Sequence, residues 1–293
     1  MPTASYDLHL HTCWSYDATA EPEAHFRRAR ELGVHTIAIT EHHNIDSWEE
    51  VAAVAGDYPE VRVVRAAELT VTTSVGNVDL LCYGLPVEPP SALAAVLTEY
   101  HDWQRRAGST LSAGLQALGC DFSDDARRKL LQTYRPERSI AFQGVTHVKN
   151  GVLRGYLIEQ GWAADEDDYH RLMKQVREQV TPPPYPAVDR VTSAVHEAGG
   201  LVAIAHPPQY FLNDDRARMD RLREECALDG IECAHPNVDA SLTSLYREYC
   251  RTHSLVSTAG SDCHDTTQLE ERFAQHGGPA EWLDEFLERI IQR

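Results

Sequence analysis

The sequence predicts an α/β fold, a closed or nearly closed barrel of about seven strands that carries a helical insertion. Short β-type runs alternate with helical stretches at both ends of the 293-residue chain, while the middle holds helical stretches with few strand candidates. Such alternation is typical of a mainly parallel sheet covered by helices. A histidine or an acidic residue also follows nearly every expected strand, which places a site at one rim of the barrel.

The first part of the chain supplies four strands and two helices. Residues 22–32 are expected to form a helix, because Pro22 stands at its start and Gly33 just past its end. Ser47 opens a second, short helix, with Glu50 at the position of a capping box. Strands are expected at residues 5–8, 35–40, 61–67 and 78–83.

The middle and the last part of the chain differ in pattern. Residues 86–180 predict a helical insertion or cap before a helix-breaking run of prolines at 182–184, so that residues 1–85 and 181–293 form the barrel. Within the insertion, helices are expected at 91–118, 124–134, 147–160 and 165–178. Beyond it, helices at 188–198, 216–227, 240–252 and 281–292 alternate with strands at 201–205, 230–233 and 255–259.

The composition excludes several classes of protein. Asp and Glu number 45 against 27 Lys and Arg, and the net charge of −18 disfavours broad binding to duplex DNA or to an anionic membrane. No apolar run is long enough to span a bilayer, and we expect no secretory signal. The seven cysteines are widely spaced without a C-x-x-C pair, so free thiols in the cytoplasm are expected. The oligomeric state is not predicted.

Potential metal ligands lie on one side of the expected strands. The carboxyl ends of parallel barrel strands converge on one face, so side chains placed there meet. His9 and His11 alternate with Leu10, and both imidazoles therefore point the same way. The other candidates that lie in or after expected strands are Asp17, His42, His43, Glu68, Asp79, His206, Asp262 and His264.

These residue types favour a metal site with more than one ion. Imidazole and carboxylate groups are ligands of zinc, manganese and iron, and the absence of convincing cysteine ligands favours the harder of these ions. A tetrahedral ion needs only four ligands, so a larger set predicts a second ion. A lone histidine in a loop is usually an ordinary polar residue. That interpretation is given to His25, His101, His170, His196, His253 and His276.

Four motifs resemble those of the PHP family, the polymerase and histidinol phosphatase domain. They are Asp7–Thr12 with the following Asp17, Ile39–His42, Ala205–Pro207 and Gly260–His264. The resemblance implies a distorted (β/α)7 barrel in which two or three divalent metal ions (Mn, Zn or Fe) hydrolyse phosphate esters. The helical insertion is similar to that of stand-alone members such as nucleoside 3′,5′-bisphosphate phosphatases and 5′-3′ exoribonucleases.

Carried over position by position, the resemblance implies a ligand set in which Glu68 bridges two metals. Those ligands are His9, His11, Asp17, His42, Glu68, His147, His206, Asp262 and His264. Family members usually carry a histidine where this chain has Asp79, which we expect to ligate in its place.

Further residues are expected around that ligand set. Nucleotide-active members place arginines around the insertion histidine, where this chain has Thr146 and Asn150. Lys149, Arg138 and Arg154 are the expected phosphate contacts instead. His43 is expected to support the ligands from outside, and Glu232 and His235 to line the pocket.

The predicted reaction is hydrolysis of a small phosphomonoester, such as a nucleotide or nucleoside bisphosphate, by metal-activated hydroxide. His206, His264 or Asp17 protonates the leaving oxygen, and the sequence does not rank them. One alternative is a metal-dependent amidohydrolase acting on a C–N bond. Binuclear members of that class often use a carboxylated lysine, and no lysine occurs here before Lys129. The other alternative is a PHP-like interaction module without catalysis.

Overall fold

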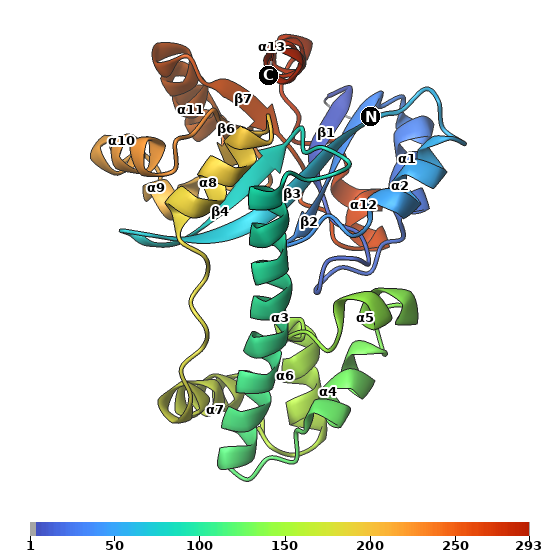
Figure 1. Ribbon diagram of the computed structural model, residues 1–293, viewed down its shortest axis with the longest axis vertical. Helices are drawn as coiled ribbons and strands as arrows, with labels where there is room; N and C mark the ends of the chain where they lie inside the picture. Colours follow the sequence, from blue (N-terminus) through green and yellow to red (C-terminus); the bar gives the residue numbers. More distant parts are fainter. Residues whose placement is uncertain (1–3, 293) are drawn as a thin grey trace.

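The computed structural model, described here for residues 4–292, contains a nearly closed barrel built from one seven-stranded sheet (Figure 1). The strands are hydrogen-bonded in sequence order, from β1 to β7. Their bounds are β1 (Tyr6–Leu10), β2 (Thr36–His42), β3 (Arg62–Thr73), β4 (Gly76–Tyr83), β5 (Leu201–Ile204), β6 (Gly230–Ala234) and β7 (Val256–Ala259). The predicted α/β barrel is confirmed.

Helices cover the outside of the barrel, and most of them lie where the sequence predicts. They are α1 (Pro22–Leu32), α2 (Trp48–Ala55), α8 (Val188–Glu197), α9 (Pro208–Phe211), α10 (Arg216–Glu225), α11 (Ala240–His253), α12 (Thr266–Arg272) and α13 (Ala280–Ile291). Gly33 ends α1 in the left-handed conformation, with φ of 69°. The short helices α9 and α12 were not predicted, because so few residues carry no clear periodicity.

The sheet departs from a parallel barrel at β4. This strand pairs antiparallel with both β3 and β5, whereas the other neighbouring strands are parallel. The strand β3 continues to Thr73, so Glu68 lies within it rather than at its end as predicted. Asp79 lies opposite Thr70 in this hairpin, near the start of β4. Because β4 is reversed, its beginning lies at the rim where the parallel strands end.

Two backbone hydrogen bonds close the barrel between its first strand and the segment after its last. The amide of Asp262 donates to the carbonyl of His9 at 2.8 Å, and the amide of His11 donates to the carbonyl of Cys263 at 3.0 Å. Gly260 permits this approach, since a Cβ there would stand 2.3 Å from the Cβ of His9. The closure therefore brings His9 and His11 beside Asp262.

The insertion is a group of helices joined to the barrel through one long helix. Figure 1 shows α3 running from the barrel into the insertion and an extended segment returning from α7 to α8. The first part of α3, with Leu93, Val96 and Tyr100, belongs to the barrel core, while Leu115 belongs to the core of the insertion. The boundaries at 86 and 180 stay a prediction. The bounds are α3 (Ser91–Ala117), α4 (Asp124–Leu131), α5 (Glu137–Gln143), α6 (Asn150–Glu159) and α7 (Glu166–Gln179).

Two local expectations for the insertion were wrong. The helix α5 was not predicted, and the helix expected from residue 147 begins at Asn150, so His147 lies in the loop before it.

In the described part of the chain, no helix is both long and apolar enough to cross a membrane. All seven cysteines are buried free thiols.

Candidate metal centre

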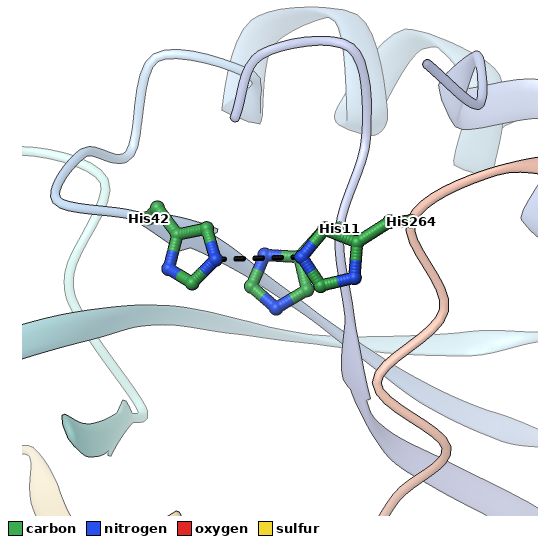
Figure 2. A group of neighbouring side chains, drawn as sticks. All are labelled: His11, His42 and His264. Atoms are coloured by element: carbon green, nitrogen blue, oxygen red, sulfur yellow. Dashed lines mark hydrogen bonds between the residues drawn. The ribbon is translucent and has the colours of Figure 1, made fainter. Parts of the chain in front are cut away.

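Three histidines from distant parts of the chain meet at the rim of the barrel. His11 follows β1, His42 ends β2, and His264 follows β7. Figure 2 shows their rings turned toward one another, and the Nε2 atoms of His42 and His264 are 3.4 Å apart. The ring of His11 stacks on both, with centroid separations of 4.3 Å to His42 and 4.2 Å to His264.

Glu68 occupies the middle of a larger cluster. Its Oε2 atom lies 3.2 Å from Nε2 of His9, from Nε2 of His11 and from Nδ1 of His42. Its Oε1 atom lies 3.0 Å from Nε2 of His206. One buried carboxylate therefore contacts four imidazoles that come from three strands, and each of its oxygens faces a different part of the cluster.

Two aspartates complete the cluster on the side of β7. Asp262 places Oδ1 3.2 Å from Nε2 of His11 and 3.5 Å from Nδ1 of His264. Asp17 places Oδ2 3.5 Å from Nε2 of both His42 and His264. The loop after β1 thus brings a carboxylate back to the imidazoles of β2 and of the segment after β7.

The donor set fits bound metal ions. Metal bonds of about 2.0–2.2 Å to histidine and carboxylate place neighbouring ligand atoms about 3.0–3.6 Å apart. The separations around Glu68 fall in this range, and so does the 3.1 Å between Nε2 of His9 and Nε2 of His11. Among residues 4–292, four groups of side chains could hold an ion. They are His11, His42 and His264; His9, Glu232 and His235; His9, His11 and Asp262; and Glu68, Asp79 and His206.

The electrostatics of the cluster also favour cations. Burial by itself would raise the pKa of Glu68, but the imidazoles of His42 and His9 outweigh burial and hold it well below its ordinary value. Burial lowers the pKa of His42, yet Asp17 and Glu68 together raise it to about 10. Carboxylates that attract protons so strongly create a negative potential that divalent ions can neutralise.

Glu232 supports two ligands at once, a role that the sequence analysis did not assign to it. Its Oε1 atom lies 2.9 Å from Nδ1 of His9, and its Oε2 accepts the amide of His206 at 2.7 Å. Such a carboxylate orients an imidazole whose other nitrogen binds a metal. The sequence feature that could have indicated this role is a charged residue within the otherwise apolar strand β6. A buried charge needs a partner, so such a residue is expected to contact another polar group.

His235 lies beside Asp262, and its Nδ1 atom is not available to a metal. Its Nδ1 accepts the amide of Asn237 at 3.0 Å. In the neutral ring, Nε2 therefore carries the hydrogen, and it lies 3.5 Å from Oδ2 of Asp262. This geometry favours a role in orienting Asp262.

His43 and Asp79 lie at the margin of the cluster. His43 contacts the hydroxyl of Thr70 through Nε2 at 2.8 Å and stacks on Tyr100, so its ring is engaged outside the group of ligands around Glu68. Asp79 lies 3.8 Å from Nε2 of His206 and accepts hydrogen bonds from the hydroxyls of Thr70 and Tyr210. Thr70 therefore connects His43 with Asp79.

His147 reaches the site from the insertion. Its ring packs on that of Tyr16 with centroids 3.8 Å apart, but it is in none of the ligand groups found in residues 4–292. Burial lowers the pKa of His147 to about 3, against the opposing effect of Asp17. Among the described residues, Nδ1 of His147 and Oδ1 of Asp17 are both buried without a hydrogen-bond partner.

The three expected phosphate contacts lie in different surroundings. Arg138 forms ion pairs with Glu21 and Glu50, and Arg154 pairs with Glu166 within the insertion. No carboxylate within residues 4–292 forms an ion pair with Lys149. Of the three, Lys149 therefore has the side chain that is most available to an anion.

An α/β barrel whose rim gathers buried imidazoles and carboxylates has the architecture of metal-dependent hydrolases. The chain belongs to the PHP domain family, whose model matches residues 7–248. The resemblance stated from the motifs is thereby confirmed.

Relatives with curated names match most of the chain. The 5′-3′ exoribonucleases Rnm of Salmonella typhimurium and Escherichia coli are 24% and 23% identical to it, over 88% of this chain and 85% of each relative. A phosphoribosyl 1,2-cyclic phosphate 1,2-diphosphodiesterase from Eggerthella lenta is 26% identical, over 88% of this chain and 93% of the relative.

Solved structures share the fold over nearly the whole chain. One from Bifidobacterium adolescentis, assigned as a metal-dependent phosphoesterase, gives a TM-score of 0.70 at 23% identity and covers 100% of both chains. An amidohydrolase from Chromobacterium violaceum, with bound sulfate and no metal, gives 0.72 at 20% identity and covers 98% of this chain and 97% of its own. These likenesses show that the fold is shared along nearly the full length of the chains.

Proposed function

We propose that this metal-dependent hydrolase of phosphoester bonds removes phosphate from a small phosphomonoester, with a nucleotide or nucleoside bisphosphate as the substrate class. The observation that carries the proposal is the position of Glu68, whose two oxygens contact four imidazoles and can bridge two ions. Phosphoester hydrolysis is also what the names of the curated relatives have in common.

The proposed ligands form the binding sites of two ions and part of the site of a third. The residues that would hold two ions are His9, His11, His42, Glu68, Asp79, His206, Asp262 and His264, and Asp17 and His147 would bind a third ion. When bound, divalent ions lower the pKa of water from about 15.7 toward 7 and neutralise the charge on phosphoryl oxygens. Manganese, zinc and iron all suit this set of nitrogen and oxygen ligands.

The remaining roles belong to side chains at the open edge of the cluster. His206, His264 and Asp17 are 13%, 14% and 16% exposed, whereas His9 and His11 are fully buried. These three side chains are therefore our candidates for protonating the leaving oxygen, from an atom that does not bind an ion. Lys149 contacts a substrate phosphate from the insertion, and Glu232 keeps the ring of His9 in place.

The arrangement favours phosphoester over C–N hydrolysis. An amidohydrolase with two metals often bridges them with a carboxylated lysine, whereas we assign the bridging role here to Glu68, which contacts His9 and His206. The net charge of −18 favours a small substrate or a strand end over duplex DNA. The buried thiols agree with a reducing compartment such as the cytoplasm.

A phosphate-release screen tests the proposal. The purified protein is assayed on small phosphomonoesters and on a short 5′-phosphorylated RNA, with Mn, Zn or Fe added in turn and ammonia release measured in parallel. His9→Ala and Asp262→Ala should lose metal and activity while the barrel stays folded. His170→Ala, an exposed histidine on α7, is the matched control.

Three results would count against the proposal. Normal phosphate release by either site variant would contradict the metal cluster as the catalytic centre. Ammonia release without phosphate release would favour the amidohydrolase. Fewer than two metal ions per purified chain, without activity under any metal, would favour an interaction module.

A further inference from the structure

One hydroxyl group of the insertion contacts two segments that lie beside the metal-binding rim. Tyr134 lies in the turn between α4 and α5, and its hydroxyl donates to the carbonyl of Tyr16 at 2.8 Å. The same hydroxyl accepts the amide of Lys149 at 3.1 Å. Tyr16 belongs to the loop after β1, whereas Lys149 belongs to the loop before α6, so the phenol bridges two segments that are distant in sequence.

Each bridged segment carries one of the proposed ligands. Asp17 follows Tyr16 directly, and His147 stands two residues before Lys149. The ring of Tyr16 also packs on the ring of His147, with centroids 3.8 Å apart. Oδ1 of Asp17 and Nδ1 of His147 are buried and without hydrogen-bond partners among the described residues, so each is free to bind a cation.

The insertion side of this bridge is held rigidly. Arg127 is 1% exposed, and its Nε and Nη1 donate to the carbonyls of Thr146 and Gly108 at 3.0 and 2.8 Å. A Cβ at Gly108 would stand 2.6 Å from the carbonyl oxygen of Thr146, so only glycine lets α3 approach so closely. The amide of His147 donates to the carbonyl of Gln104, also on α3, at 3.2 Å. The backbone of His147 is therefore fixed within the insertion.

The barrel side depends on contacts from the turn before α5 and from the last residue of α5. Besides the hydroxyl of Tyr134, Arg135 contacts the carbonyl of Trp14 at 3.4 Å and the hydroxyl of Thr146 at 3.1 Å. Gln143 donates to the same carbonyl of Trp14 at 3.0 Å. Of these groups, the Tyr134 hydroxyl is bonded next to Asp17 itself.

We propose that Tyr134 is a positioning residue that sets the distance between Asp17 and His147 and thereby tunes the binding of the cation they share. The inference rests on the proposed function, since it takes both residues as ligands. Loss of a group that orients a metal ligand typically weakens metal affinity by about 10–100-fold. Tyr134→Phe removes only the hydroxyl and keeps the ring.

Manganese titration of the chelator-treated, full-length protein tests this role. Free Mn²⁺ is measured by electron paramagnetic resonance for the wild type, Tyr134→Phe and His147→Ala. Tyr156→Phe is the matched control, because Tyr156 lies on α6 and packs on Phe122 within the insertion. We expect Tyr134→Phe to weaken the last Mn²⁺ bound by about 10–100-fold, His147→Ala to lose that ion, and Tyr156→Phe to match the wild type.

Hydrogen exchange and the His147 variant separate the possible failures. In Tyr134→Phe, the amides of residues 15–17 and 146–149 should exchange faster than in Tyr156→Phe, with the same circular dichroism spectrum. Identical Mn²⁺ binding and exchange in the two tyrosine variants, while His147→Ala loses an ion, would overturn the role of Tyr134 and leave the proposed function intact. Full Mn²⁺ binding by His147→Ala would instead remove the ligand assignment, and the inference with it.

Discussion

Replacing Gly260 by alanine should open the barrel where its first strand meets the segment after its last. The new Cβ would stand 2.3 Å from the Cβ and 2.6 Å from the amide nitrogen of His9. Because carbon atoms pack at about 3.5–4.0 Å, the two segments must separate by about 1 Å. Such a shift breaks the hydrogen bond from Asp262 to His9, at 2.8 Å, and the one from His11 to Cys263, at 3.0 Å.

The size of the effect follows from these losses. Overpacking costs about 1–3 kcal/mol, and each lost hydrogen bond costs about 0.5–1.5 kcal/mol. We therefore expect the free energy of unfolding to fall by about 2–6 kcal/mol. The same shift moves His9 and His11 away from Asp262, so metal affinity should fall as well.

Urea unfolding of the metal-free protein, followed by circular dichroism, measures this change. Gly151→Ala is the control, since no atom lies within 4 Å of its added Cβ and α6 should gain about 0.5–1 kcal/mol from alanine. An unfolding midpoint for Gly260→Ala equal to that of the wild type, with unchanged Mn²⁺ binding, would refute the steric argument.

Three further predictions concern the cluster itself. Chelation should lower the melting temperature, and added Mn²⁺ should restore it. At a free Mn²⁺ concentration 100 times Kd, one bound ion raises the free energy of unfolding by about 2.7 kcal/mol. An unchanged melting temperature would contradict binding of ions to the folded protein. Burial lowers the pKa values of His42 and His206, but Asp17 and Glu68 raise that of His42 to about 10, and Glu68 raises that of His206 to about 8. Both rings are therefore expected to be protonated in the metal-free protein at pH 7. Mn²⁺ must then displace protons, affinity should weaken as the pH falls, and calorimetry in buffers of different ionisation enthalpy should detect proton release. Glu68→Gln should abolish binding of at least one ion, whereas Glu232→Gln should weaken affinity by about 10–100-fold, and equal metal content in both variants and the wild type would contradict the bridging role.

The secondary structure was predictable wherever a long segment carried its own signals. The helix α1 begins at Pro22 and ends before Gly33, as the sequence indicates. The strand β3 was harder to predict, because its continuation to Thr73 depends on pairing with β4 in a hairpin. The direction in which strands pair depends on two segments together. The residues of β4 alone therefore do not indicate that it runs antiparallel to its neighbours.

The sequence predicted which residues form the candidate site better than it predicted how they are arranged. His11, His42 and His264 were identified from their positions after strands, and the fold brings their rings together. Glu232 was expected only to line the pocket, and Tyr134 was not identified, because each acts through contacts with residues far away in the chain. Such contacts have no local periodicity or motif.

The sequence by itself determined the class of fold, the family and the chemical types of side chain at the rim, because periodicity and short motifs are local properties of the chain. Only the tertiary structure decided that Glu68 stands between four imidazoles, that Asp79 reaches the rim through a reversed strand, and that the insertion is tied to the loop of Asp17. The physical reason is that each of these features is a distance between groups that are far apart in sequence. Such distances are set only when the barrel closes and the insertion docks on it.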